Sequence, residues 1–237
     1  MKIVDDARMA IAQLSGPGLA RLQSRFPQAL WSGPGDRRQL ALTFDDGPDA
    51  RDTPQLLEAL ARHQVSATFF QIGQRAEQQP ALVRMVAAAG HQIAMHGYYH
   101  HPFPLQAPLA LRAQLVRTQR LIAAASGRVP SSVRDVRPPY GVVTPATLAA
   151  LTAWGYRPVM WSVVPFHWLQ PAEPTIEQTV RHASAGSVLV LHERLAGPPV
   201  AALVAAIVPR LLEAGFEFVS VDQMWRQREA CAADQDA

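Results

Sequence analysis

Two adjacent carboxylates, Asp45 and Asp46, follow a short apolar stretch and precede a Gly-Pro pair. The apolar residues 39–42 predict a strand, and the Gly-Pro pair predicts a turn directly after the carboxylates. Carboxylates at the end of a buried strand are costly to bury unless a metal ion, a proton or an arginine pairs with them. Because adjacent residues of an extended chain point in roughly opposite directions, the two carboxylates can hold different roles. A solvated turn is the plain alternative, and the rest of the chain must decide between the two.

A pair of histidines, His96 and His100, follows the predicted strand 91–95. On a helical turn, residues with this spacing share one face, so the two imidazoles can bind the same metal ion. With one carboxylate from Asp45 or Asp46, the set can hold a catalytic zinc and leave a position open for water. By itself the spacing is a weak signal, which a packed loop also explains.

Three further side chains stand at the ends of predicted strands. Arg137 precedes a Pro-Pro turn and can pair with the carboxylate that does not bind metal, although a surface cation is the alternative. His192 ends a very apolar stretch, where it can donate a proton to a leaving group or cap backbone groups. Trp161 belongs either to the core or to the wall of a pocket for a sugar ring or an acyl methyl group.

Strands and helices alternate regularly along the chain. The predicted strands cover residues 39–44, 67–72, 91–95, 133–137, 157–163, 187–192 and 216–220. The predicted helices between them cover about 52–63, 79–89, 107–125, 145–154, 174–184 and 199–214. This alternation favours an α/β fold with a parallel sheet and helices outside. A closed or nearly closed barrel fits better than an open doubly wound sheet, and its strand ends would bring the polar residues together.

The composition predicts a single globular domain with a sizeable core, because 49% of the 237 residues are hydrophobic and 17% are charged. The net charge is +3 and the arginines are scattered, so we expect no nucleic-acid binding. The single cysteine, Cys231, excludes an intrachain disulfide and a cysteine-based zinc site.

No apolar run reaches the ~18 residues of a membrane span, and the first residues lack the apolar core of a signal peptide. We therefore predict a cytoplasmic protein without a transmembrane segment. Residues 7–30 predict one or two weakly amphipathic helices broken at 16–18, which pack on the domain; peripheral contact with a membrane surface is the alternative. The predicted division is 1–37 as N-terminal helical flank and linker, 38–225 as catalytic domain and 226–237 as flexible tail. The oligomeric state is not predicted.

The motifs, in this order, resemble those of the polysaccharide deacetylases of carbohydrate esterase family four, the NodB-homology domain. Residues 43–48 (Thr-Phe-Asp-Asp-Gly-Pro) match the first motif, and His96 and His100 match the second. Residues 137–140 (Arg-Pro-Pro-Tyr) match the third motif, and 191–192 (Leu-His) match the fifth. The resemblance covers roughly residues 38–222. It implies an α/β fold, a deformed (β/α)7 TIM-like barrel with parallel strands.

The resemblance also implies a divalent metal, Zn2+ first with Co2+ or Ni2+ as alternatives, and hydrolysis of an N-acyl group on an amino sugar. It assigns roles to named positions. The metal ligands would be Asp46, His96 and His100. The catalytic residues would be Asp45 as general base, Arg137 as its partner and His192 as general acid. The backbone N–H near Tyr140 would help hold the oxyanion, and we expect Pro139, Tyr140 and Trp161 to contact the substrate.

The sequence departs from the family pattern at two places. Gly97 stands where the family usually has serine or threonine, so a small hydrogen bond that supports the ligand loop is lost. In the fourth motif, Val164 and His167 stand where acidic residues usually fall. We therefore expect another group, such as Glu193 or His167, to support His192, or the acid step to run at lower pH. The change also reshapes the substrate groove.

We thus predict a metal-dependent carbohydrate N-deacetylase whose partner is an N-acylated sugar or glycan. One alternative is a deformylase or deacetylase of a lipid-linked amino sugar at the inner membrane face. The other is a catalytically impaired, carbohydrate-binding relative.

Overall fold

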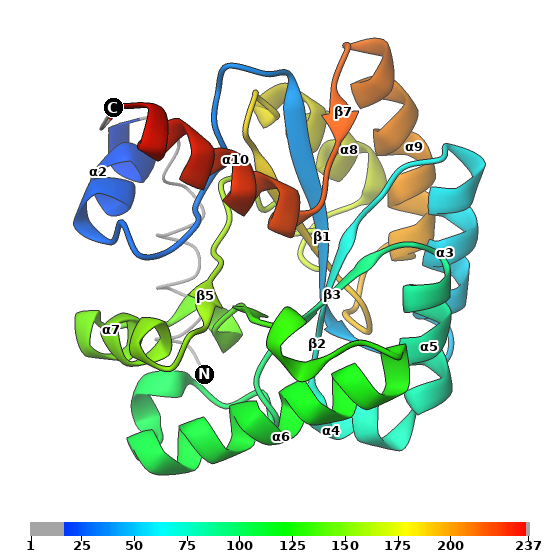
Figure 1. Cartoon of the computed structure of the whole chain (residues 1–237). Coiled ribbons are helices and arrows are strands. Elements are labelled where there is room, and N and C mark those ends of the chain that lie inside the picture. Colours follow the sequence, from blue (N-terminus) through cyan, green and yellow to red (C-terminus); the bar gives the residue numbers. More distant parts are fainter. Residues whose placement is uncertain (1–16, 236–237) are drawn as a thin grey trace.

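The computed structural model describes residues 17–235, and its seven strands all run parallel. Their order is β5-β4-β3-β2-β1-β6, and β7 pairs with the start of β1. Figure 1 shows the helices packed around the outside of these strands. The strands are β1 (Gln39–Gly47), β2 (Thr68–Gln71), β3 (Gln92–Met95), β4 (Asp135–Val136), β5 (Arg157–Pro158), β6 (Val188–His192) and β7 (Glu217–Phe218).

The helices follow the strands in alternation, as the sequence predicts. They are α2 (Pro17–Arg25), α3 (Asp52–Arg62), α4 (Gly73–Gln78), α5 (Pro80–Ala88), α6 (Pro108–Ser126), α7 (Pro145–Ala153), α8 (Ala172–His182), α9 (Val200–Glu213) and α10 (Val221–Gln235). Three short 3-10 turns occur in the loops: η1 (Phe103–Leu105), η2 (Pro130–Ser132) and η3 (Pro139–Gly141). The predicted α/β fold is confirmed.

Successive side chains of β1 point alternately into two hydrophobic clusters, and this alternation determines which face carries its polar side chains. Leu40, Leu42 and Phe44 belong to the cluster that packs against the outer helices. Ala41 belongs to the inner cluster, which includes Phe70 of β2 and Val190 of β6. Because successive side chains of a strand point to opposite faces, Thr43 and Asp45 share the inner face with Ala41.

The sheet does not close through a continuous ladder between β5 and β6, so the barrel is deformed. Backbone segments from two parts of the chain fill the opening. The Leu30 N–H donates to the Pro158 carbonyl at 2.9 Å, and the Leu30 carbonyl accepts from Met160 at 2.8 Å. On the other side, the Gly33 N–H donates to the Gly186 carbonyl at 2.8 Å. The segment before β1 is therefore part of the barrel wall.

Several predicted boundaries were wrong. The strands predicted at 133–137 and 157–163 are reduced to β4 and β5, and Pro158 has no N–H to extend a ladder. The helix α4 was missed, because it starts only two residues after β2. Of the helices predicted at 7–30, residues 7–16 lie outside the described part, and the second starts at Pro17.

The expected flexible tail at 226–237 is helical as far as Gln235. Trp225 is buried on α10, and Arg228 donates hydrogen bonds to the carbonyls of Ala29 and Pro27. The C-terminal helix is thus docked on the segment before β1. Within residues 17–235, no helix is both long enough and apolar enough to cross a membrane.

Replacing Leu30 tests whether the segment before β1 belongs to the core, since its side chain is fully buried. We expect Leu30→Ala to lower the free energy of unfolding by about 2–5 kcal/mol, the usual cost of such a cavity. The control is Leu105→Ala, at a side chain that is 83% exposed; it should change stability by less than about 0.5 kcal/mol. Urea unfolding followed by circular dichroism measures both variants. Equal, small effects would contradict a structural role of this segment.

Candidate active site

Four strands end at one edge of the sheet, and each carries a polar side chain there. Asp45 and Asp46 lie at the end of β1, and His96 follows β3 directly. Arg137 follows β4, and His192 ends β6. Asp45 and His192 are register partners on neighbouring strands. The fold therefore brings together residues that are far apart in the sequence, at the edge where parallel barrels hold their active sites.

Arg137 is fully buried and holds the inner face of β1. Its Nη1 donates to Asp45 Oδ1 at 2.6 Å and to Thr43 Oγ1 at 2.8 Å. Its Nη2 donates to the Met160 carbonyl at 2.9 Å. Burial lowers the pKa of this guanidinium, whereas Asp45 raises it. The alternative of a surface cation is wrong, and the predicted partnership with Asp45 is present in the structure.

Asp46, His96 and His100 form a cluster whose ligand atoms all lie within 4.8 Å of one another. His100 Nε2 is 3.0 Å from Asp46 Oδ1, and His96 Nε2 is 3.6 Å from the same oxygen. Both Asp46 and His100 have positive φ angles, of 70° and 60°. The carboxylate that joins the histidines is thus Asp46, while Asp45 is held by the arginine.

The protonation states of the cluster suit a metal site. Burial lowers the pKa of His96 to about 4, so its imidazole is neutral at pH 7. Burial alone would raise the pKa of Asp46, but contact with His100 and the nearby His96 and His192 hold it well below its usual range. A neutral imidazole and an ionised carboxylate are the forms that bind metals.

The tautomer of His96 is fixed by its backbone partner. Its Nδ1 lies 2.8 Å from the Arg137 carbonyl oxygen, which can only accept, so Nδ1 carries the proton. The Nε2 lone pair then faces Asp46 and His100. Asp46 Oδ1 and His100 Nε2 are buried and lie 3.0 Å from each other, and neither has another hydrogen-bond partner within the described residues. Together with His96 Nε2, they are two nitrogens and one oxygen, a set that fits a divalent metal such as zinc.

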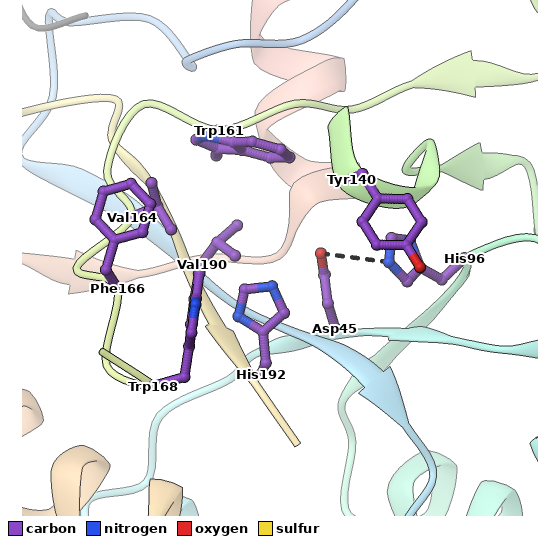
Figure 2. A pocket seen from close by; sticks show the side chains of 9 residues that line it. All are labelled: Asp45, His96, Tyr140, Trp161, Val164, Phe166, Trp168, Val190 and His192. Atoms are coloured by element: carbon purple, nitrogen blue, oxygen red, sulfur yellow. Dashed lines mark ion pairs between the residues drawn. The ribbon is translucent and has the colours of Figure 1, made fainter. Parts of the chain in front are cut away.

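A small cavity opens beside this cluster, as Figure 2 shows. Asp45, His96, Tyr140 and His192 line one part of it. An apolar wall lines the other part and consists of Trp161, Val164, Phe166, Trp168 and Val190. The cavity measures about 20 Å³, room for roughly one water-sized group.

Of the three residues predicted to contact substrate, Tyr140 and Trp161 line the cavity. Pro139 is buried and is not among the lining residues, so its contact stays a prediction. Sequence reasoning missed Phe166, Trp168 and Val190 as wall residues. The aromatic residues of 161–168 were the available signal, but nothing in the sequence shows which of them face Asp45.

The local backbone conformation explains why glycine stands at position 97, where the family usually has serine or threonine. Its φ angle is +73°, a conformation that residues with a Cβ rarely adopt. A Cβ built there would also lie 3.2 Å from the Phe103 ring. A serine or threonine at this position would therefore strain the loop that carries His100.

His167 stands in the fourth motif, where the family usually has an acidic residue. It is buried and bonds to the backbone of His192, the predicted general acid. Its Nε2 accepts a hydrogen bond from the His192 N–H at 3.0 Å. Burial lowers the pKa of His167 to about 3, so the ring is neutral. An aspartate would carry a charge at this position, whereas His167 supports residue 192 without one.

Glu193 is fully buried beneath the turn that ends β1. Its carboxyl group accepts a hydrogen bond from Thr53, and a Cβ at Gly47 would overlap its Oε1. Burial raises the pKa of Glu193 to about 8, and the nearby Asp49 and Asp52 act in the same direction. At pH 7 this carboxyl group is therefore mostly protonated.

Comparison with known proteins agrees with this geometry. Residues 32–159 match the family model described as polysaccharide deacetylase, and the chain belongs to that family. Over 199 residues it is 34% identical to a peptidoglycan-N-acetylglucosamine deacetylase of Bacillus cereus. This alignment covers 83% of this chain and 71% of that protein. Over 197 residues it is 34% identical to a chitooligosaccharide deacetylase of Sinorhizobium fredii, covering 77% of this chain and 89% of that protein.

Among solved structures, the Bc1960 peptidoglycan N-acetylglucosamine deacetylase aligns with a TM-score of 0.79 at 30% identity. The alignment covers 85% of this chain and 94% of that one. The predicted family and the deformed parallel barrel are confirmed.

The raised pKa of Glu193 predicts a pH dependence of stability. Between the unfolded pKa, ordinarily 4.5, and the folded pKa of about 8, the folded state binds more protons. Stability must then fall as pH rises through this window, by up to a few kcal/mol. Removing the titrating group with Glu193→Gln should make the decline of the unfolding free energy from pH 5 to pH 8 shallower.

Glu213→Gln, at an exposed residue of α9, is the matched control and should leave that decline unchanged. Chemical unfolding at several pH values measures the slopes. The same slope in wild type and Glu193→Gln would show that Glu193 is ionised in the folded state.

Proposed function

We propose that this protein is a metal-dependent hydrolase that removes an N-acyl group, in the first place acetyl, from amino sugars of a glycan. The single observation that carries the proposal is the convergence of the Asp46-His96-His100 cluster with an arginine-held Asp45 and with His192 at one end of the barrel. The relatives are named for deacetylation of peptidoglycan or chitooligosaccharides, which supports glycans of this class as substrates.

Asp46, His96 and His100 would hold the metal, with zinc as the first choice and cobalt or nickel as alternatives. A divalent ion there supplies Lewis acidity, which polarises the amide carbonyl and makes water a better nucleophile at neutral pH. All remaining tasks fall to side chains and backbone groups of this chain.

Asp45 is the proposed general base. Arg137 engages its Oδ1, and its Oδ2 lies 3.8 Å from His96 Nε2, on the side of the cluster. That oxygen can accept the proton of the attacking water. The arginine fixes the carboxylate in position and balances its charge, so the base is oriented before substrate arrives.

His192 is the proposed general acid. It lines the cavity together with Asp45, and it hands a proton to the departing amine nitrogen, which is a poor leaving group without one. His167 fixes the backbone of residue 192. A backbone N–H near Tyr140, in η3, would support the negative charge that develops on the carbonyl oxygen.

The apolar wall would contact the acyl group. Its aromatic and valine side chains suit a small apolar group such as the methyl of an acetyl. Formyl is the smaller alternative. Nothing in the described residues favours a lipid-linked sugar over a soluble or polymeric glycan, and a cytoplasmic location stays a prediction. The intact set of ionisable residues argues against an impaired relative.

Metal binding is tested by direct measurement. Protein incubated with zinc and desalted should retain about one ion per chain, as expected for a three-residue site. His100→Ala should lose most of this zinc, because it removes one of three ligands. His182→Ala, an exposed histidine of α8, is the control and should retain it. Elemental analysis by mass spectrometry gives the ratio; zinc retained equally by both variants would refute the site.

The base role is tested by Asp45→Asn, which keeps the size of the side chain and spares the three ligands. We expect acetate release from N-acetylated chitooligosaccharides or peptidoglycan fragments to fall by about 10²–10⁴-fold, the usual value of a general base. Zinc content should stay unchanged. Asp36→Asn, at an exposed aspartate before β1, controls for the substitution.

Wild-type turnover by Asp45→Asn would move the base role to another residue. Absence of acetate and formate release by the zinc-loaded wild type, on polymeric, oligomeric and lipid-linked substrates alike, would overturn the proposed function.

A further inference from the structure

A second cavity lies at the amino ends of β2, β3 and β4, the opposite edge of the sheet from the candidate active site. Its volume is about 840 Å³, within the range of small-molecule sites. We call it the basal pocket. The residues that matter for its chemistry are Arg128, Ser131, Arg134, Gln92, Asp222 and Arg226.

The basal pocket is strongly cationic. Three arginines line it against a single carboxylate, that of Asp222. This carboxylate is already engaged, by Arg157 at 2.6 Å and by Arg226. Arg128 and Arg134 are exposed, and within residues 17–235 their side chains make no ion pair or hydrogen bond. Two guanidinium groups therefore face the same cavity without a counter-charge in the described part of the chain.

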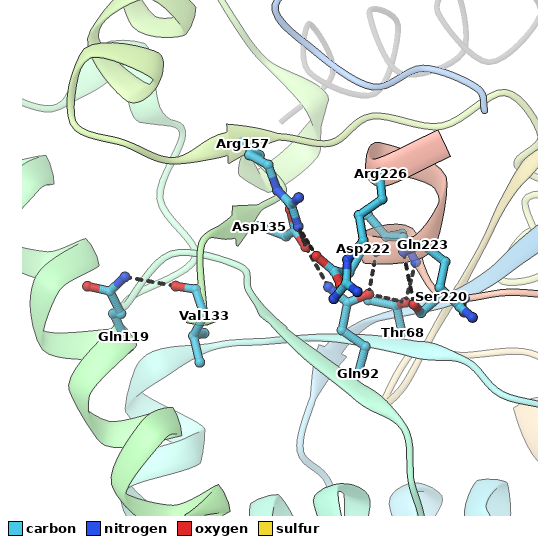
Figure 3. A network of polar contacts seen from close by, with 11 residues as sticks. Thr68, Gln92, Gln119, Val133, Asp135, Arg157, Ser220, Asp222, Gln223 and Arg226 are labelled. Atoms are coloured by element: carbon cyan, nitrogen blue, oxygen red, sulfur yellow. Dashed lines mark hydrogen bonds and ion pairs between the residues drawn. The ribbon is translucent and has the colours of Figure 1, made fainter. Parts of the chain in front are cut away.

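Three lining residues of the basal pocket, Gln92, Asp222 and Arg226, belong to a network of polar contacts that Figure 3 shows. Asp135 is buried and accepts two hydrogen bonds from Arg157, at 2.7 and 2.8 Å. Gln92 donates to Asp135 at 2.5 Å and accepts from the Asp222 N–H at 2.9 Å. Because the side chains of Gln92, Asp135 and Asp222 have partners inside the protein, this part of the pocket does not need to rearrange when a ligand arrives.

The start of α10 adds to the positive potential. Ser220 and Gln223 cap it reciprocally: the Ser220 N–H donates to the Gln223 side chain, and the Gln223 N–H donates to the Ser220 hydroxyl. The Val221 N–H is bonded to Thr68. These backbone donors are occupied, so a ligand would be held by the arginine side chains, while the helix dipole favours negative charge nearby.

We propose that the basal pocket binds a compact phosphorylated ligand, with the phosphate held between Arg128 and Arg134. Guanidinium groups match phosphate oxygens with paired, charge-assisted hydrogen bonds. The serine and glutamine side chains of the walls suit hydroxyl groups next to the phosphate. Aromatic side chains are absent from the lining residues, so the pocket offers no stacking surface for a nucleobase.

The test uses the zinc-loaded full chain and isothermal titration calorimetry with glucose 6-phosphate, inorganic phosphate and glucose. We expect saturable binding of the two phosphate-bearing probes and none of glucose. The double variant Arg128→Gln/Arg134→Gln should weaken that binding by at least about tenfold, which equals roughly 1.4 kcal/mol. Arg84→Gln, an exposed arginine of α5 outside the pocket, should bind like wild type.

The two probes distinguish the sources of the phosphate. Tighter binding of glucose 6-phosphate indicates a phosphorylated sugar, and equal binding indicates the free anion; both outcomes support the pocket. Absence of saturable binding by wild type, or equal binding by the double variant with an unchanged melting temperature, overturns the proposal. Acetate release is measured on the same samples. Acetate release should be the same in the double variant as in wild type. If wild type releases no acetate but binds the phosphate probes, the proposed function fails and the basal pocket stands.

Discussion

The buried ion pair between Arg137 and Asp45 is the interaction on which the active-site end of the barrel depends. One guanidinium group joins the inner face of β1, through Asp45 and Thr43, to the carbonyl of Met160 beyond β5. It also lies over the Phe70 ring of β2, at 4.0 Å from the ring centre. Breaking a buried pair on one side leaves an uncompensated charge and costs about 3–5 kcal/mol. The same contact that orients Asp45 therefore keeps several strand ends together.

This arrangement is possible because the inner face of β1 changes from apolar to ionisable side chains toward its carboxyl end. Ala41 packs in the apolar inner core, Thr43 bonds to the arginine and to the Leu189 carbonyl, and Asp45 stands at the open end. A strand that was apolar to its last residue would place no ionisable group at the open end of the barrel. The alternation puts the ionisable groups where the barrel opens and keeps the apolar side chains below them.

The sequence identified the polar residues that meet at the candidate site better than the residues around them. Asp45, Asp46, His96, Arg137 and His192 were found because a polar residue at the end of an apolar strand is conspicuous, and parallel strands end at one edge. From the residues alone, the ligand role was open between the two aspartates. The resemblance to the family's motifs pointed to Asp46, and the structure places Asp46 beside both histidines.

What the sequence could not predict depends on contacts between distant segments. The apolar wall exists because the irregular segment after β5 runs back beside β6, where Val163 and Leu189 form a bridge. The position of α10 depends in the same way on Arg228, which donates a hydrogen bond to the backbone carbonyl of Ala29. Likewise, the arginines of the basal pocket are scattered along the sequence, and Arg128 and Arg226 come to line the same pocket only when the chain folds.

The charge balance of the site explains how it can tolerate a neutral His167. Asp45 and Arg137 cancel each other, and the lowered pKa of His96 keeps its imidazole neutral. Asp46 is then the single carboxylate among the three proposed metal ligands, so this donor set would cancel only part of the charge of a divalent ion. The remaining positive charge would favour negative charge on a substrate carbonyl oxygen in a buried, low-dielectric site. An additional anion at residue 167 would oppose that stabilisation, whereas a neutral imidazole braces the backbone of residue 192 without weakening it.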